Sequence, residues 1–466
     1  MQLPEELIAS LTNVDGFDPA PFIEVHQSGS AVTSIRINPS KSAADVMPFP
    51  TNHPVPWSRH GYYLERRPSF TFDPFFHAGC YYVQEASSMF LEQALLQTTD
   101  VSRSLKVLDL CAAPGGKSTH LHSLISADSL LLSNEVIRPR SGILKQNITR
   151  WGCSNVIVTS NDPKHFQKLN GFFDVIVADA PCSGSGLFRK DAAAVDEWSP
   201  ELVQICCGRQ RRILADVLPA LKEGGVLIYS TCSFSKEENE DIAEWLVGEM
   251  NMECIELKTE TEWGIVTATG AANDVAGYRF YPDKAKGEGF FLSCFRKLTA
   301  DVAKDLKGVK PALLNRLEME GILPWIAPNA NLQFLKHEQY VFAFPADLVT
   351  SFLQVQSALY IQYAGTACGM LIRGKLVPDH ALALSTILRS ELPSLDLNYE
   401  DSIRYLQRND LHLEPHLKGW QTVRYKGNSL GWVNVLANRI NNYYPKELRI
   451  LKRENGSDSE KYAPSL

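Results

Sequence analysis

The stretch FFDVIVADAPCSGSG, residues 172–186, decides how this chain folds. Its first half is an almost unbroken apolar run, which is typical of a parallel strand that helices cover on both faces. The run ends at Asp179, and a loop of small residues follows that carries the pair Pro181 and Cys182. The stretch therefore predicts a buried parallel strand with a thiol just beyond its carboxyl end.

The same apolar pattern recurs along the section from residue 104 to 297. It appears in KVLDL (106–110), LLLSN (130–134), NVIVTS (155–160) and GVLIYST (225–231). The lengths between these runs suit β-α-β crossovers, and a Gly-Glu-Gly turn within residues 278–297 predicts a final hairpin. We therefore expect an α/β fold, with a Rossmann-like, doubly wound sheet that finishes in an antiparallel hairpin.

Composition and charge exclude several classes of protein. A chain of 466 residues can form two to four domains. Its net charge of −7 argues against a protein that coats nucleic acid on every face, but leaves room for a local basic surface. The ten cysteines form no C-x-x-C pair, so neither disulfides nor a metal are expected. Without a signal-peptide pattern or a run of about 18 apolar residues, a cytoplasmic protein is expected.

Each predicted parallel strand ends in, or is soon followed by, a polar or reactive residue. Ligands of open α/β sheets bind beyond the carboxyl ends of the strands, near the switch in strand order. The residues at those ends are Asp109, Glu135, Asp162, Asp179 and Cys232. A few acids would occur there by chance, but such a residue at every strand end indicates a binding site.

The loop after the first strand, CAAPGGKST (111–119), indicates which ligand this site takes. A P-loop would need glycine where Cys111 stands, and a G-x-G-x-x-G motif is absent. What remains is a Pro-Gly-Gly turn that lets the backbone approach a ligand, or else a tight turn without one. Glu135 stands where Rossmann-type sites place the acid that binds ribose, and Asp162 is suited to capping a loop or accepting from adenine. Together they favour S-adenosylmethionine over ATP or NAD.

Two of the ten cysteines stand apart. Free cysteine is usually a small buried apolar residue. We expect this of Cys80, Cys153, Cys206, Cys207, Cys254, Cys294 and Cys368. Cys182 and Cys232 instead follow strand ends at the ligand-binding edge. After Cys232, Ser235 and Glu238 predict a capping box, whose helix N-terminus would favour a thiolate. Two such thiols predict covalent catalysis on an electron-poor ring, but their positions do not decide which one attacks.

Several motifs resemble the Nol/Nop/Sun family of RNA 5-methylcytosine methyltransferases. They are DLCAAPGGKSTHL (109–121), VADAPCSGSGLFRKD (177–191), YSTCSFSKEENE (229–240), GCYYVQEASSM (79–89) and SIRINPSK (34–41). The tail GWVNVLANRINNYYPKELR (431–449) resembles the PUA-like domain of the bacterial RsmF group, which methylates a cytidine of small-subunit (16S) ribosomal RNA. The resemblance covers nearly the whole chain.

This resemblance implies a role for individual residues. The contacts to S-adenosylmethionine would be Cys111, Ala112, Ala113, Pro114, Gly115, Gly116, Lys117, Glu135, Asp162 and Asp179. Cys232 corresponds to the nucleophile that adds to carbon 6 of cytosine, and Cys182 to the residue that helps to release the product. Asp179 would hydrogen-bond the base near N3 and stabilise charge during the attack, after the base has left its stack. Lys190 either positions the base or a phosphate, or is simply solvated.

RNA contacts are expected near both ends of the chain. Between Lys418 and Arg453, eight cations face one acid, with aromatic residues interleaved. The cations are Lys418, Arg424, Lys426, Arg439, Lys446, Arg449, Lys452 and Arg453, and the aromatic residues are Trp420, Tyr425, Trp432, Tyr443 and Tyr444. Such a surface suits phosphate contacts and base stacking; the alternative is a small barrel with an aromatic core and solvated cations. A second candidate contact consists of Arg36, Arg59, Arg66 and Arg67.

The expected organisation has four parts. They are an N-terminal RNA-binding region (1–85), a methyltransferase domain (86–298), an intermediate domain that opens with a linker (299–375) and a PUA-like RNA-binding domain (376–466). We expect a monomer that binds 16S ribosomal RNA or the small subunit, and no membrane.

The motifs leave three other functions open. One is a tRNA cytosine-C5 methyltransferase, and another is a methyltransferase of the adenine amino group, which the DAPC motif (179–182) matches poorly. The third is a ribosome-assembly protein with a vestigial site, which the intact Cys232 and glycine loop disfavour.

Overall fold

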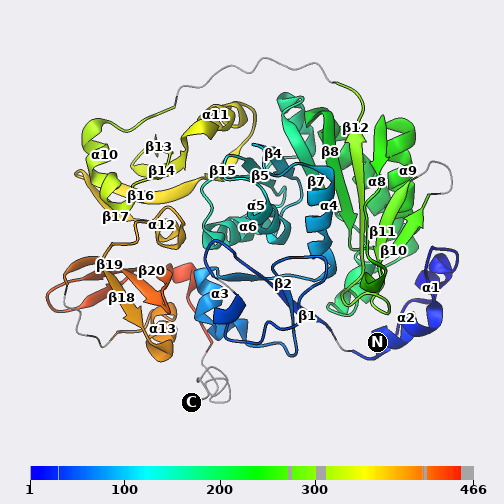
Figure 1. The fold of residues 1–466 in the computed structure, drawn as a ribbon, viewed down its shortest axis with the longest axis horizontal. Coiled ribbons are helices and arrows are strands. Elements are labelled where there is room, and N and C mark those ends of the chain that lie inside the picture. The colour runs from blue at the N-terminus through cyan, green and yellow to red at the C-terminus, as the bar shows by residue number, and fades with distance from the viewer. Residues whose placement is uncertain are drawn as a thin grey trace.

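The computed structural model describes residues 2–29, 31–42, 44–270, 275–300, 311–411, 413 and 417–452. A ten-stranded sheet crosses the middle of the molecule in the order β10-β11-β12-β8-β7-β4-β5-β6-β15, with β9 paired to β12 (Figure 1). The five neighbours β8, β7, β4, β5 and β6 are parallel. The predicted doubly wound α/β sheet is confirmed.

The parallel strands create a switch in strand order. They are β4 (Lys106–Asp109), β5 (Leu130–Asn134), β6 (Val156–Thr159), β7 (Phe173–Asp179) and β8 (Leu221–Thr231). From β4 the chain moves outward through β5 to β6, and then returns to place β7 on the other side of β4. The order therefore reverses between β4 and β7, which is where open α/β sheets bind their ligands.

Antiparallel strands complete the sheet at both edges. β12 (Phe290–Lys297) pairs antiparallel with β8 and with β11 (Ala276–Phe280), so the predicted hairpin is present. β10 (Val266–Thr269) and β9 (Met252–Ile255) extend this edge. At the other edge β15 (Ile361–Ala364) pairs antiparallel with β6, a strand that the apolar pattern did not predict.

Helices cover both faces of the sheet. One face packs against α4 (Leu91–Thr98), α5 (Gly116–Leu124) and α6 (Arg138–Trp151), and the other against α8 (Pro200–Val217), α9 (Glu240–Glu249) and α11 (Val349–Ala358). Along β4, Val107 belongs to the first hydrophobic core and Leu108 to the second, and both are fully buried. This burial on two faces explains why the strand sequences are continuous apolar runs.

Local signals set the ends of the covering helices. Ser199 caps α8, because its side chain accepts a hydrogen bond from the Leu202 amide and Pro200 occupies the first helical position. Gly152 ends α6 in the left-handed conformation, with φ of 92°. The remaining α-helix of this region is α7 (Ala193–Glu197). The short 3₁₀ helices are η1 (Ala44–Val46), η2 (Phe70–Phe72), η3 (Ser87–Phe90), η4 (Pro163–Leu169), η5 (Ser185–Leu187), η6 (Leu218–Ala220), η7 (Lys236–Glu238), η8 (Thr261–Trp263), η9 (Leu323–Trp325), η10 (Ala346–Leu348) and η11 (Lys446–Leu448).

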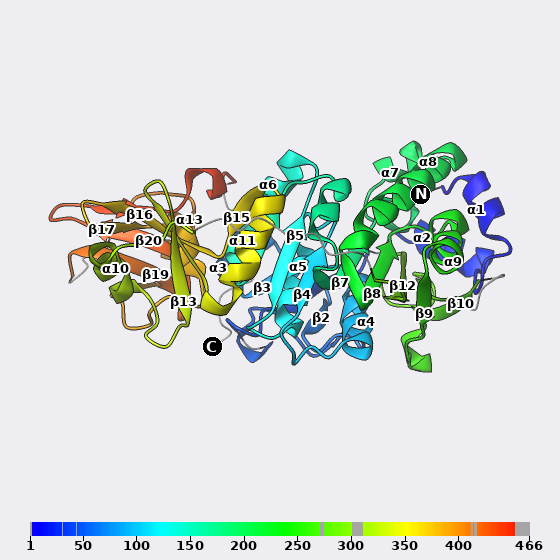
Figure 2. The same ribbon diagram turned by 90° about the horizontal axis from the view of Figure 1, so that it is seen from above.

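Smaller units flank the central sheet, as the elongated view of Figure 2 shows. The N-terminal elements are α1 (Glu5–Leu11), α2 (Pro19–Gln27), α3 (Pro74–Ala78) and the sheet β2-β1-β3, formed by Gly61–Leu64, Thr33–Ile37 and Tyr81–Val83. At the other end lie two four-stranded sheets. The first contains β13 (Leu332–His337), β14 (Tyr340–Pro345), β16 (Thr366–Ile372) and β17 (Lys375–Pro378), with α10 (Arg316–Ile322) and α12 (His380–Leu384) nearby. The second contains β18 (Ser394–Leu397), β19 (Gly419–Tyr425), β20 (Asn428–Val435) and β21 (Ile440–Asn442), with α13 (Tyr399–Leu406).

The C-terminal sheet corrects part of the predicted RNA surface. Trp432, Tyr425 and Tyr444 are buried, so these three aromatic residues form core packing rather than a stacking surface. Trp420 and Tyr443 remain at least partly exposed, with ring centroids 4.4 Å apart. Exposed cations on this sheet are Lys418, Lys426, Arg439, Lys446, Arg449 and Lys452, while Arg424 is half-buried. Arg453, and residues 301–310 of the predicted linker, lie outside the described residues.

No helix in the described ranges has both the length and the apolar character to cross a membrane. Within the same ranges, no three His, Cys, Asp or Glu side chains gather as a metal site.

Candidate active site

The predicted site residues lie along one edge of the sheet. Because β8, β7, β4, β5 and β6 are parallel neighbours, their carboxyl ends meet at the same edge. Residues 111–117 follow β4, Glu135 follows β5, Asp162 follows β6, and Asp179 ends β7. Cys182 and Cys232 follow β7 and β8, which are adjacent strands.

The loop after β4 is held by the helix that follows β5. Gly115, the N-cap residue before α5, has φ of 115°. A Cβ atom there would lie 3.3 Å from side-chain atoms of Asn147 and Leu144, both on α6. The Asn147 amide donates to the Pro114 carbonyl at 2.6 Å, and Arg140 donates to the Ala113 carbonyl at 2.9 Å. The loop is therefore a fixed turn whose conformation requires glycine.

Arg36 supports this loop from behind, which corrects its prediction as an RNA contact. The side chain is fully buried. Its Nη2 donates to the Thr119 hydroxyl at 2.6 Å and to the Gly116 carbonyl at 3.3 Å, and its Nε donates to Gln84 at 2.8 Å. Arg36 thus joins the N-terminal sheet to the first turn of α5. The other three arginines of that group, Arg59, Arg66 and Arg67, are exposed.

Two acidic residues border the space beyond β5 and β6. Glu135 is buried, and its carboxylate accepts from the Ile137 amide at 2.9 Å and lies 3.5 Å from Arg140. The next two side chains, Val136 and Ile137, are 54% and 49% exposed, so an apolar surface adjoins the acid. Asp162 does cap its loop, because its carboxylate accepts from the Lys164 amide at 3.1 Å.

Asp179 and Lys117 form an ion pair where the strand order switches. Lys117 Nζ lies 2.8 Å from Asp179 Oδ2, and the Ser230 hydroxyl donates to Oδ1 at 2.8 Å. Burial opposes the charge of Lys117, but Asp179, with smaller effects of Asp109 and Cys232, outweighs burial and raises the pKa of this lysine. The Asp179 side chain keeps about a third of its surface exposed, at 34%. A cation and a hydrogen-bonding carboxylate therefore face the site together.

The two cysteines are in contact. Their Sγ atoms lie 2.9 Å apart, although 50 residues separate them in the chain, and both side chains are half-buried free thiols. The hydrogen bond with Cys232, followed by burial, raises the pKa of Cys182 well above its ordinary value. Of the seven other cysteines predicted as small buried residues, six are buried and Cys254 is half-buried.

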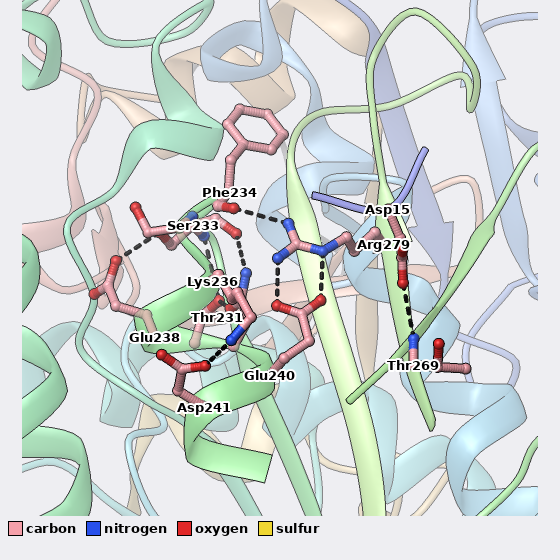
Figure 3. A network of polar contacts seen from close by, with 12 residues as sticks. Asp15, Thr231, Ser233, Phe234, Lys236, Glu238, Glu240, Asp241, Thr269 and Arg279 are labelled. Atoms are coloured by element: carbon pink, nitrogen blue, oxygen red, sulfur yellow. Dashed lines mark hydrogen bonds and ion pairs between the residues drawn. The ribbon is translucent and has the colours of Figure 1, made fainter. Parts of the chain in front are cut away.

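The predicted capping box after Cys232 is wrong. Ser235 makes no capping hydrogen bond, its hydroxyl has no partner in the described structure, and α9 begins only at Glu240. The Glu238 carboxylate instead accepts from the hydroxyl of Ser183, next to Cys182. It also accepts from the hydroxyl of Ser233, next to Cys232; Glu238 and Ser233 are labelled in Figure 3. The predicted activation of Cys232 by a capped helix N-terminus is therefore wrong. Glu238 is a residue of the candidate site, although its spacing from Ser235 predicts a capping role.

Lys190 lies exposed on the loop after Cys182. Its role as a contact to the base or a phosphate stays a prediction. Cys111 is a half-buried residue of the loop after β4, and burial raises the pKa of its thiol.

Three family models match the chain. They are 16S rRNA methyltransferase RsmB/F over residues 95–296, the N-terminal domain of 16S rRNA methyltransferase RsmF over residues 3–86, and the methyltransferase RsmF PUA domain over residues 392–450. The matched ranges include every residue of the candidate site.

Proteins named ribosomal RNA small subunit methyltransferase F are similar over most of the chain. The one from Aliivibrio salmonicida is 32% identical over 447 residues, which cover 89% of this chain and 90% of that protein. The one from Pectobacterium atrosepticum is 28% identical over 445 residues, with 89% of each chain covered.

Two solved structures share the fold of about two thirds of the chain. A methyltransferase homologue from Pyrococcus horikoshii is 30% identical with a TM-score of 0.51, and the match covers 64% of this chain and all of that one, 100%. The structure of NSun6 from Pyrococcus horikoshii with SFG is 19% identical with a TM-score of 0.53, covering 64% of this chain and 98% of that one.

Proposed function

Because this chain belongs to the RsmB/F family of 16S rRNA methyltransferases, we propose that it methylates carbon 5 of a cytidine in small-subunit ribosomal RNA, with S-adenosylmethionine as the methyl donor. The observation that carries the proposal is the 2.9 Å contact between the thiols of Cys182 and Cys232 at the ends of adjacent strands. Two thiols in one site suit covalent activation of a pyrimidine ring, because one can attack while the other assists release.

The residues beyond β4, β5 and β6 fit S-adenosylmethionine, which supplies an electrophilic methyl group when bound. In the loop from Cys111 to Lys117, Gly115 has a positive φ of 115° that glycine adopts freely, which suits a turn whose backbone approaches a ligand. The Glu135 carboxylate is suited to ribose hydroxyls, and the exposed Val136 and Ile137 offer an apolar surface to adenine. Asp162 keeps 29% of its side chain exposed and can accept from the adenine amino group. These roles remain predictions for each residue.

Cys232 is the nucleophile in this proposal. Its thiolate forms a bond to carbon 6 of cytosine, and the electron pair of the carbon 5–carbon 6 double bond moves to carbon 5, in conjugation with carbon 4 and N3. Carbon 5 thereby becomes nucleophilic. Asp179 hydrogen-bonds the base near N3, and the neighbouring Lys117 stabilises negative charge that develops during the attack.

Cys182 assists the release of the product. After carbon 5 has accepted the methyl group, its proton must leave to a base. The electron pair of that carbon–hydrogen bond then restores the ring double bond, and the bond to Cys232 breaks. The 2.9 Å contact between the Cys182 and Cys232 thiols supports this role, because a base bound covalently to Cys232 would lie beside Cys182.

RNA binding is assigned to the exposed cations of the C-terminal sheet. Lys418, Lys426, Arg439, Lys446 and Arg449 are exposed, which suits phosphate contacts. The match to the RsmF PUA domain over residues 392–450 supports the same region.

The proposal is tested by trapping the covalent intermediate. Cys182→Ala and Cys232→Ala are expressed in cells, and each is run on a denaturing gel with and without nuclease. We expect an RNA-linked band, collapsed by nuclease, for Cys182→Ala only. A band for Cys232→Ala alone would reverse the two roles, and no band for either would remove the covalent mechanism. Bisulfite sequencing of 16S rRNA from cells with and without the protein then locates the modified cytidine.

A further inference from the structure

Glu238 connects the two cysteine loops. It is fully buried in η7, six residues after Cys232. Its Oε1 accepts from the Ser183 amide at 2.8 Å and from the Gln210 amide at 3.1 Å. Its Oε2 accepts from the Ser183 hydroxyl at 2.6 Å and from the Ser233 hydroxyl at 2.5 Å. Ser183 is the residue after Cys182, and Ser233 is the residue after Cys232, so one carboxylate binds both loops directly beyond their thiols.

A neutral side chain cannot replace these contacts. Four donors converge on the two oxygens, and a carboxylate accepts at both. Glutamine would present one oxygen and one NH₂ group, which would face either the Ser183 amide or the pair of hydroxyls. Burying a carboxylate is unfavourable, and burial does raise the pKa of Glu238 even with these donors present. The buried carboxylate of Glu238 is therefore unfavourable by itself, and its hydrogen bonds fix how the Cys182 and Cys232 loops contact each other.

We propose that Glu238 is a positioning residue that holds the thiols of Cys182 and Cys232 in contact, so that attack and release occur on the same base. The part concerning attack and release rests on the function proposed above. The part concerning the contact between thiols does not, because that contact exists without any substrate.

The first experiment measures the thiol contact alone. The purified protein is treated with diamide, which oxidises two thiols to a disulfide and is itself reduced to the hydrazine. The Cys182–Cys232 disulfide is then quantified by peptide mass spectrometry over time. The variants are Glu238→Gln, Glu238→Ala and the double variant Ser183→Ala/Ser233→Ala, which removes two donors but keeps the carboxylate. Glu237→Gln is the matched control, since Glu237 is the neighbouring half-buried acid of the same turn.

We expect rapid disulfide formation in the unchanged protein and in Glu237→Gln. Glu238→Ala should be slower by about 10-fold, because a hydrogen bond to a charged group stabilises by about 1.5 kcal/mol or more. The double serine variant should be slowed in the same direction. The melting temperature of each variant is measured as well, because it shows whether the variant folds. If Glu238→Ala does not fold, Glu238→Gln or the double serine variant takes its place. Equal rates in all folded variants would overturn the proposal, as would the absence of the disulfide in the unchanged protein.

The second experiment measures the balance between attack and release. With 16S rRNA and S-adenosylmethionine, a Glu238→Ala protein that still attacks but releases slowly should accumulate part of the covalent adduct, and its kcat should fall with little change in KM. A purely structural defect would lower adduct and product together, and that result would also overturn the proposal. If neither Cys182→Ala nor Cys232→Ala forms an adduct, the proposed covalent mechanism fails, while the diamide result still decides whether Glu238 holds the thiols.

Discussion

Arg279 and Glu240 offer a measurable test of how the Cys232 loop is stabilised. The Arg279 side chain is 2% exposed. Its Nε donates to Glu240 Oε1 at 2.6 Å, and its Nη1 donates to the Phe234 carbonyl at 2.8 Å (Figure 3). Phe234 is two residues beyond Cys232. One guanidinium on β11 therefore holds both the start of α9 and the backbone that follows the proposed nucleophile.

The expected magnitude follows from burial. Removing one partner of a buried ion pair leaves an unpaired charge and costs about 3–5 kcal/mol. We expect Arg279→Met and Glu240→Leu each to lower the free energy of unfolding by an amount in this range. The double variant leaves no buried charge, so it should lose less than the sum of the two single changes by about 2 kcal/mol or more. Arg279→Met also leaves the Phe234 carbonyl without this donor, so activity should fall further than in Glu240→Leu.

The measurement combines urea unfolding with hydrogen exchange of peptides from β11 and α9, because local stability of this region is the quantity predicted. Arg296→Met is the control: Arg296 lies on the neighbouring strand β12, and its Nη1 donates to the Gly224 carbonyl at an exposed position. That change should cost less than about 1 kcal/mol. If the double variant loses the full sum of the two single changes, the ion pair does not act as a unit and the reasoning is refuted.

Three further predictions concern the cofactor loop, a buried acid and RNA binding. Gly115→Ala should weaken S-adenosylhomocysteine binding by about 10-fold or more in calorimetry, because φ of Gly115 is 115° and the new Cβ would have neighbours at 3.3 Å. Gly224→Ala is the control: Gly224 also has a positive φ but no atom within 4 Å of an added Cβ, so this variant should bind S-adenosylhomocysteine normally. Burial raises the pKa of Asp109 to about 7, against about 4 when unfolded. The contribution of this carboxyl to the free energy of unfolding is therefore fully present below about pH 4, and it is lost as the pH rises to 7. Asp109→Asn should remove this loss of stability with rising pH, which is at most about 4 kcal/mol. Equal pH dependence of the melting temperature in the unchanged protein and in Asp109→Asn would contradict the prediction. Combining Lys418→Gln with Lys446→Gln should weaken RNA binding and reduce its salt dependence by about one to two counterions; an unchanged salt slope would show that these cations do not contact phosphate.

The central sheet was predictable because its strands are buried on both faces. Residues such as Val107 and Leu108 point to opposite cores and are both apolar, so each strand is visible as a continuous run. The candidate site was visible for a related reason. The carboxyl ends of parallel strands share an edge, so Asp179 and the two cysteines could be placed together before their distances were known.

Other features depend on contacts that sequence spacing does not contain. The spacing of Ser235 and Glu238 suits a capping box, but the donors of Ser183, on another loop, compete for the same carboxylate. Trp432 has a large aromatic ring that could stack on a base. It is buried instead, because the small C-terminal sheet uses large apolar side chains for its own core. The charge of Arg36 predicts a surface position. The side chain is buried instead, because the Thr119 hydroxyl and the Gly116 carbonyl accept hydrogen bonds from its guanidinium. In each case a long-range partner decides the role.

Strand β15 has a consequence for how the protein is made. It pairs with β6. The side-chain Nδ2 of Asn161 donates to the Tyr360 carbonyl at 2.9 Å, and the backbone amide of Tyr360 donates to Asn161 Oδ1 at 3.0 Å. Asn161 directly precedes Asp162, so the rim of the proposed cofactor site is completed by chain that leaves the ribosome about 200 residues after β6. At ordinary rates of synthesis this interval lasts about 10–40 s. Until then β6 is an open sheet edge, prone to pairing with other chains. The nascent protein therefore has an aggregation-sensitive period that ends only when the chain that follows β15 begins to emerge.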